Sequence, residues 1–202
     1  GHSADITGVT LDGDTDGLGL NASELIALVS AGTVTKTSGS STGSVNLDFS
    51  AASTAFDYLA ETESVTLTYT VAINDGDGGI TSQTFTIIIT GTNDAPVILT
   101  ASAPSLTTIT EDQTANAGQT VASFLGASIA DVDHGALQGI AITATTGAHG
   151  HWEYSIDGST FVAFPAVSGG SALLLAATDM VRFVPDGQDG GTDTFTYVAW
   201  DQ

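Results

Sequence analysis

The chain has 202 residues and a formal net charge of −21, because 23 aspartates and glutamates are opposed by only two basic residues, Lys36 and Arg182. So few cations cannot neutralise phosphates, which excludes nucleic acid as a partner and argues against an anionic membrane surface. The chain has no cysteine, and no apolar run approaches the length needed for membrane insertion. Its length suits about two small β domains.

Three alternating aspartates stand near the start of the chain. Asp12, Asp14 and Asp16 match the first half of an EF-hand-like loop, in which alternate acidic residues wrap a calcium ion. Such a loop requires a bidentate glutamate at its twelfth position, where this chain has Ser23. The pattern therefore has two interpretations, a calcium loop or a solvated acidic turn.

The first half of the chain is predicted to be mostly strands. Asn21–Ser30 is the one convincing helix, because Asn21 can cap its start and Gly32 can end it. Elsewhere, apolar and polar residues alternate as they do in half-buried strands. The predicted strands are Ala4–Val9, Thr33–Thr37, Ser44–Phe49, Val65–Ala72 and Thr84–Thr90.

The second half continues the same pattern. A hairpin is predicted from His151–Ile156 and Phe161–Phe164, with the side chains of Trp152, Tyr154 and Ile156 on one buried face. Further strands are predicted at Ile140–Ala144, Ala172–Ala176, Met180–Val184 and Thr194–Ala199.

One stretch marks the boundary between two domains. Asp75 and Asp77 lie in a glycine-rich acidic turn, and the strand that follows ends at Gly91-Thr92-Asn93-Asp94-Ala95-Pro96. Proline has no N–H for a sheet ladder and biases the residue before it toward an extended backbone. One domain therefore ends here and a second begins.

The linker and two further motifs resemble those of a known family. Thr68-Tyr69-Thr70-Val71, the Asp-Gly-Asp-Gly-Gly turn and Gly-Thr-Asn-Asp-Ala-Pro-Val are similar to VCBS and bacterial cadherin-like repeats of large secreted (RTX-type) adhesins. The stretch Val181–Asp201 also looks like the last third of a bacterial cadherin-like domain. In cadherin-type repeats a similar linker helps to hold calcium between domains, so the resemblance implies a calcium site here.

The acidic residues supply candidate ligands for this site. Calcium takes six to eight oxygen ligands, and flexible turns with several carboxylates suit it better than magnesium. The candidates at the domain boundary are Asn93, Asp94, Asp131 and Asp133, with help from Glu63, Asp75 or Glu111; Asp12, Asp14, Asp16 and Asp77 are candidates in separate turns. The alternative is that all of them are ordinary polar turn residues.

Catalytic motifs are not evident. There is no cysteine nucleophile, and no serine lies in a Gly-x-Ser-x-Gly elbow. His149 and His151 form a weak zinc motif without a clear third ligand, and a solvated position on the hairpin is the favoured interpretation. We therefore expect a protein that is not an enzyme.

The fold expected is all-β, with two tandem Ig-like or cadherin-like Greek-key sandwiches over residues 4–95 and 96–202. Residues 1–3 are interpreted as an expression remnant and the chain as part of a longer protein. One or both domains are expected to be truncated. The second lacks a final strand, because no counterpart of Thr84–Thr90 follows Thr194–Ala199, and the first is short upstream of Tyr69 compared with the second upstream of Tyr197, which indicates missing opening strands. At least one sheet edge is then exposed.

The function expected is that of a calcium-binding extender repeat in a bacterial adhesin at the cell surface, serving cell adhesion and biofilm attachment. Its partners would be neighbouring repeats of the same chain, with surface glycans or proteins bound by other domains. Two alternatives remain: a carbohydrate- or protein-binding module that uses Phe161, Phe164 or Trp200, and an accessory domain of a secreted hydrolase.

Overall fold

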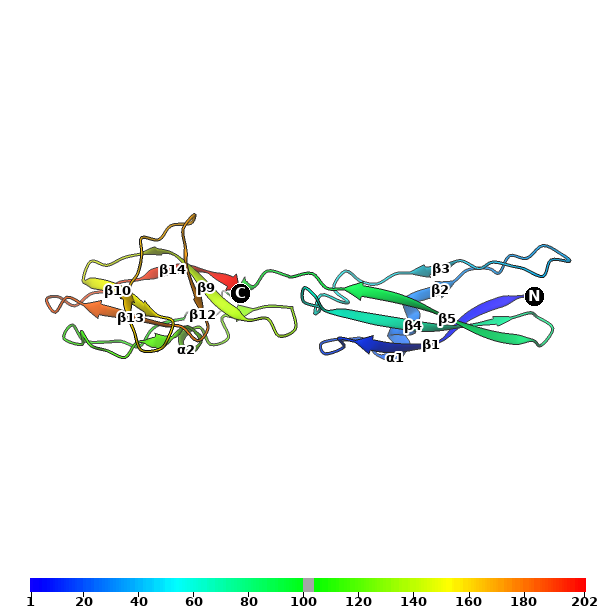
Figure 1. Ribbon diagram of the computed structural model, residues 1–202, viewed down its shortest axis with the longest axis horizontal. Helices are drawn as coiled ribbons and strands as arrows, with labels where there is room; N and C mark the ends of the chain where they lie inside the picture. Colours follow the sequence, from blue (N-terminus) through cyan, green and yellow to red (C-terminus); the bar gives the residue numbers. More distant parts are fainter. Residues whose placement is uncertain (100–103) are drawn as a thin grey trace. The chain divides into compact units, whose positions relative to one another are not determined.

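The computed structural model describes residues 1–99 and 104–202. Most of its regular structure is strands in small antiparallel sheets, which confirms the all-β class. The chain divides into two compact units, Gly1–Asn93 and Asp94–Gln202, so the division falls two residues before the expected boundary. Figure 1 shows the sheets of each unit.

Unit 1 is built on a three-stranded antiparallel sheet. Its strands are β1 (Ser3–Gly13), β4 (Ser64–Asn74) and β5 (Ile80–Thr90), in the order β1-β4-β5. The central strand buries alternate residues, as the period of two predicts, and its Tyr69 is fully buried. The Tyr69 ring stacks on Phe85, its partner across the strand pair, with ring centroids 5.3 Å apart.

A short helix and a small hairpin cover this sheet. They are α1 (Ala22–Ala27) and the pair β2 (Val29–Ala31) and β3 (Leu47–Phe49). Asn21 and Glu24 form a capping box at the start of the helix, which satisfies backbone N–H groups that the helix itself leaves unpaired. Leu25 is buried, and its carbonyl oxygen accepts a 2.9 Å hydrogen bond from the hydroxyl of Tyr69.

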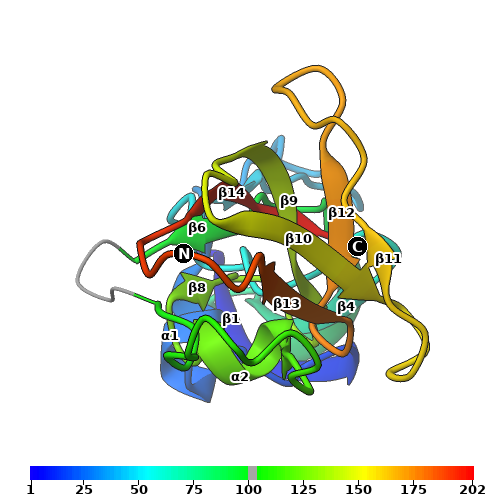
Figure 2. The same cartoon turned by 90° about the vertical axis from the view of Figure 1, so that its left-hand side faces the viewer.

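Unit 2 contains two larger sheets and one strand pair around a single core (Figure 2). The first sheet has the order β11-β10-β13-β7, with β11 (Val162–Ala163), β10 (Gly150–Ser155), β13 (Met180–Pro185) and β7 (Gln119–Thr120). The second has the order β12-β9-β14, with β12 (Leu173–Ala176), β9 (Gln138–Thr145) and β14 (Phe195–Asp201); the pair is β6 (Val97–Ile98) with β8 (Ile129–Ala130), and α2 spans Val121–Leu125.

Several details differ from the sequence-based expectations. Thr33–Thr37, predicted as a strand, forms only an isolated bridge between Thr35 and Ser44. The predicted helix is shorter, because β-branched Val29 pairs with Phe49 and the chain turns into β2. Ile156 is not in the core: it is 74 % exposed, because β10 ends at Ser155 and the chain enters a turn held by the Asp157 carboxylate. The helix α2 was not predicted.

The Tyr69 hydroxyl gives a test of the unit 1 core. Tyr69→Phe removes a buried hydrogen bond and should lower the free energy of unfolding of unit 1 by about 1 kcal/mol. Chemical denaturation monitored by circular dichroism measures the change. Tyr197→Phe is the matched control, and a loss as large in the control would show that the Tyr69 hydroxyl contributes nothing specific.

Candidate metal centre

Three predicted ligands converge where unit 2 begins. The backbone N–H of Asp94 donates a 2.8 Å hydrogen bond to Oδ2 of Asp133. The N–H of Asp133 in turn donates to Oδ1 of Asp131, at 3.0 Å. The pairing of β6 with β8 fixes this arrangement, because it places the segment after the linker alongside the segment that leads to Asp131.

Asp133 is the unusual residue of this group. It is only 6 % exposed, and its Oδ1 atom has no hydrogen-bond partner in the described part of the chain. Burial raises the pKa of the carboxyl, and the charges of Asp131, Asp94 and Asp201 raise it further, against the lowering effect of the Asp94 N–H. A buried carboxylate with an unsatisfied oxygen among like charges is a favourable place for a cation.

Asp201 is a member of this cluster that sequence reasoning did not select. It lies at the end of β14 and pairs with Gln138 at the start of β9. The side chain of Gln138 donates to the carbonyl of Ile129, which ties this end of the sheet to β8. The sequence shows Asp201 after Trp200, but only the strand register reveals which residues lie near it.

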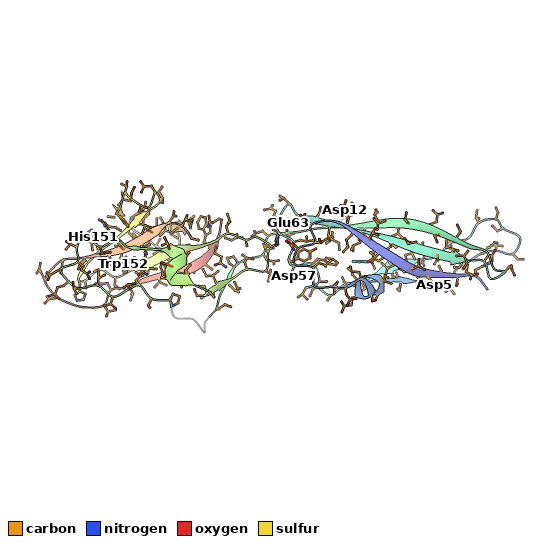
Figure 3. All side chains as sticks on the ribbon, turned by 90° about the horizontal axis from the view of Figure 1, so that it is seen from below. Asp5, Asp12, Asp57, Glu63, His151 and Trp152 are labelled. Atoms are coloured by element: carbon orange, nitrogen blue, oxygen red, sulfur yellow. The ribbon has the colours of Figure 1, made fainter. Side chains whose placement is uncertain are left out.

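Unit 1 has a second group of acids, at one end of its sheet. Asp12, Asp57 and Glu63 gather toward this end, whereas Asp5 lies toward the other (Figure 3). Asp14 Oδ2 accepts a hydrogen bond from the N–H of Ser64, and its carbonyl accepts one from the Tyr58 hydroxyl. Burial raises the pKa of Tyr58, and the charges of Asp14 and Glu63 raise it further.

The start of the linker is anchored to the same end of unit 1. The N–H of Gly91 donates to the carbonyl of Glu63 at 2.9 Å, and the Glu63 carboxylate accepts from the N–H of Ala60. Thr62 between them has a left-handed backbone with φ of 79°, which is uncommon for a β-branched residue. The structure therefore brings Glu63 and Asp14 to this end, with Asn93 two residues beyond Gly91.

The EF-hand-like pattern does not form a wrapped loop. Asp12 lies within β1 opposite Thr66, and Asp14 caps the neighbouring strand. The glutamate that follows the twelfth position, Glu24, accepts from the N–H of Asn21 in the helix cap. Over residues 1–99 and 104–202, no three acidic or histidine side chains stand ready to hold a metal ion.

Two predicted contributors to the boundary site lie elsewhere. Asp75 and Asp77 are in the turn after Asn74, so the 11 residues of β4, about 35 Å, separate them from Glu63. Asp75 accepts from the N–H groups of Asp77 and Gly79, and these bonds lower its pKa. Glu111 lies beside Gly190, before the start of β14, whereas Asp201 ends that strand.

The two histidines of the weak zinc motif, His149 and His151, contact different carboxylates. His149 Nδ1 lies 3.0 Å from Asp193 Oδ2, and His151 Nε2 lies 3.2 Å from Glu153 Oε1. Glu153 also receives Arg182, with its Nη2 atom 2.6 Å away. These contacts hold neighbouring strands and turns together and do not form a zinc site.

The aromatic side chains proposed for sugar binding do not form an exposed row. Phe161 lies under the guanidinium of Arg182, and Phe164 stacks on Trp152. The ring of Trp200 packs over Gly139, where a Cβ would leave it no room. Among the described residues, Phe49 in unit 1 is the most exposed of the aromatic side chains, and it is only 38 % exposed.

No protein-family model, curated protein or solved structure matches the chain. Among the described residues, neither helix is long and apolar enough to cross a membrane.

Asp133→Asn tests the cost of the buried charge. In calcium-free buffer at neutral pH, the amide keeps an acceptor for the Asp94 N–H and offers donors to neighbouring carboxylates. The variant should therefore be more stable by about 1 kcal/mol. Because folding raises the pKa of Asp133, the cost is full above the folded-state pKa, shrinks as the pH falls through it and is gone below the lower pKa of the unfolded chain.

The advantage of Asp133→Asn should accordingly shrink on acidification, which denaturation at several pH values measures. Asp189→Asn, in an exposed turn of unit 2, is the control. A variant that is less stable than the parent chain in calcium-free buffer at neutral pH would contradict the interpretation.

Gly91→Ala tests the anchoring of the linker. A Cβ at this position would overlap the carbonyl oxygens of Leu59 and Ala60. The substitution should destabilise unit 1 by about 2 kcal/mol, since backbone cannot give way as a flexible side chain would. Thermal unfolding measures it, with the exposed neighbour substitution Thr92→Ala expected to change stability by less than about 0.5 kcal/mol.

Proposed function

We propose that this chain is a non-enzymatic, calcium-binding extender segment of a secreted bacterial surface adhesin. Its two units would be cadherin-like Greek-key sandwiches in tandem. The observation that carries the proposal is Asp133, a buried carboxylate with one unsatisfied oxygen beside three other aspartates.

A cation resolves the electrostatic conflict at Asp133. Without one, the folded state must either keep a buried negative charge or protonate it, as the raised pKa indicates. With 23 acidic and two basic residues, the chain has almost no cationic side chains that could do this instead. Every candidate residue offers an oxygen atom as its ligand, and oxygen ligands favour a hard divalent cation.

Four carboxylates are available to hold such an ion: Asp94, Asp131, Asp133 and Asp201. Calcium fits them better than magnesium, because it accepts flexible, carboxylate-rich surroundings whereas magnesium demands a near-ideal octahedron.

The mechanical role follows from the position of Asp94 in the linker. A cation held by Asp94 and Asp133 would fix the direction in which the linker joins unit 2 and so reduce hinge freedom. The Asn93–Asp94 peptide also leads back to the acids of unit 1, Glu63 and Asp14. In an adhesin, calcium-dependent stiffening of successive repeats would project a distal binding domain from the cell.

Calcium would also link folding to location. Binding only to the folded state adds RT ln(1 + [Ca²⁺]/Kd), about 2.7 kcal/mol at a hundredfold excess over Kd. The chain would then remain loose in the calcium-poor cytosol and fold after secretion.

Thermal unfolding and small-angle scattering with calcium, with magnesium and with chelator test the proposal. We expect a calcium-specific rise in melting temperature and a stiffer particle. Asp133→Asn should abolish most of the rise, and Asp189→Asn should keep it. Unchanged behaviour in calcium would refute the proposal and direct attention to glycan screening for the binding-module alternative.

A further inference from the structure

Aspartate followed directly by glycine recurs through this chain. The pairs are Asp12-Gly13, Asp16-Gly17, Asp75-Gly76, Asp77-Gly78, Asp157-Gly158, Asp186-Gly187 and Asp189-Gly190. Such a pair is chemically reactive, because no side chain shields the glycine nitrogen, which can attack the carboxyl carbon of the preceding aspartate. The attack requires freedom of both groups, so the fold decides which of the pairs react.

Hydrogen bonds restrain the carboxylate in three of the pairs. Asp75 and Asp157 each accept from two backbone N–H groups further along their turns, and Asp186 accepts from one. These bonds fix the side chain in position and stabilise its charged form, whereas the reaction needs a mobile, neutral carboxyl group. For Asp157 the bonds also lower the pKa, so the neutral form is scarce at neutral pH.

Packing restrains the glycine in two further pairs. Gly13 is paired with Val65 in the ladder between β1 and β4, so its backbone is held in the sheet. Gly17 lies against Tyr58, and an added Cβ would come within 3.0 Å of the ring atom Cδ2. In both pairs the glycine nitrogen cannot move toward the preceding carboxyl carbon without disturbing these contacts.

The pairs Asp77-Gly78 and Asp189-Gly190 have neither restraint. In the part of the chain that the structure describes, neither aspartate carboxylate accepts a hydrogen bond, and both residues are exposed. An added Cβ on Gly78 would meet no atom within 4 Å, and one on Gly190 would meet only the end of the Glu111 side chain, at 3.5 Å. The first pair lies in the turn of the β4–β5 hairpin (Figure 1), and the second lies between β13 and β14.

We propose that Asp77 and Asp189 are modification sites, at which aspartate converts to isoaspartate in the folded chain. The nitrogen of the following glycine bonds to the side-chain carboxyl carbon, and the carboxyl hydroxyl leaves with the N–H proton as water. Water then opens the cyclic imide. Opening at the side-chain carbonyl restores aspartate, and opening at the main-chain carbonyl gives isoaspartate. The water released is regained, so the conversion needs no other reactant.

The conversion changes the backbone of the turn. The main chain then runs through the former side chain and is longer by one carbon atom, and the carboxylate that is left free is the α-carboxylate. A methyl-donating enzyme of the class that repairs isoaspartate would take this carboxylate as its substrate. The proposal does not depend on calcium binding.

Each reactive residue has a matched control in its own turn, Asp75 for Asp77 and Asp186 for Asp189. The controls share the dipeptide and the exposure and differ in the hydrogen bonds on the carboxylate. The whole 202-residue chain is aged in neutral buffer in which circular dichroism shows it to be folded. A protease that cleaves before aspartate but not before isoaspartate, followed by mass spectrometry of the peptides, measures conversion at each position.

Asp77 should convert about ten times faster than Asp75, and Asp189 about ten times faster than Asp186, because one hydrogen bond to a charged carboxylate is worth about this factor. In guanidinium chloride these hydrogen bonds are lost, so the two rates within each turn should converge. The substitution Asp77→Glu should remove the signal at this position, since the larger ring closes far more slowly, and should leave the rate at Asp189 unchanged.

Three results would overturn the proposal. The first is the lack of isoaspartate at residues 77 and 189 of the aged, folded chain. The second is an equal rate for the two aspartates of either turn. The third is a difference between them that persists in guanidinium chloride, since the neighbouring sequence rather than the fold would then set the rates.

Discussion

Scarcity of positive charge is the constraint on which this structure depends. With two basic side chains against 23 acidic ones, few carboxylates can be paired by ion pairs, and Glu153 with Arg182 is an exception. Backbone N–H groups take the place of the missing cations. They bind the carboxylates that shape the turns and strand ends of both units: Asp14, Asp75, Asp133, Asp157, Asp179 and Asp193.

The carboxylates that accept backbone hydrogen bonds include some whose pKa is lowered and one, Asp133, whose pKa is raised. For Asp75 and Asp157, hydrogen bonds from turn N–H groups lower the pKa. For Asp193, burial raises the pKa but hydrogen bonds from residues 146–149 outweigh it, so the net shift is downward. The pKa of Asp133 is shifted upward instead, because the hydrogen bond from one N–H does not offset the effects of burial and of three nearby negative charges. Asp75, Asp157 and Asp193 thus stabilise the calcium-free fold as anions, whereas the carboxyl of Asp133 resists ionisation.

Sequence reasoning recovered the elements that depend on local pattern. The alternation of Val65, Leu67 and Tyr69 identified β4, and the Asp157-Gly158 turn identified the β10–β11 hairpin. The predictions were wrong where pairing between distant residues determines the structure. Val29, for example, was predicted to be helical but pairs with Phe49 in a strand. The site shows the same division. Asp131 and Asp133 carry a local spacing signal, but Asp75 was assigned to the wrong end of a strand and Asp201 was missed, because only register brings it near.

The open edge of β14 also bears on the solubility of the protein. In the described part of the chain β14 pairs only with β9, and the unpaired edge of a strand is a template for pairing between identical molecules, which leads to aggregation. At neutral pH the net charge of −21 makes molecules of this chain repel one another, and this long-range repulsion opposes such pairing. The repulsion weakens as the pH approaches the isoelectric point near 4.1, and concentrated salt screens it. Colloidal stability and strand pairing are therefore coupled in this chain through its carboxylates.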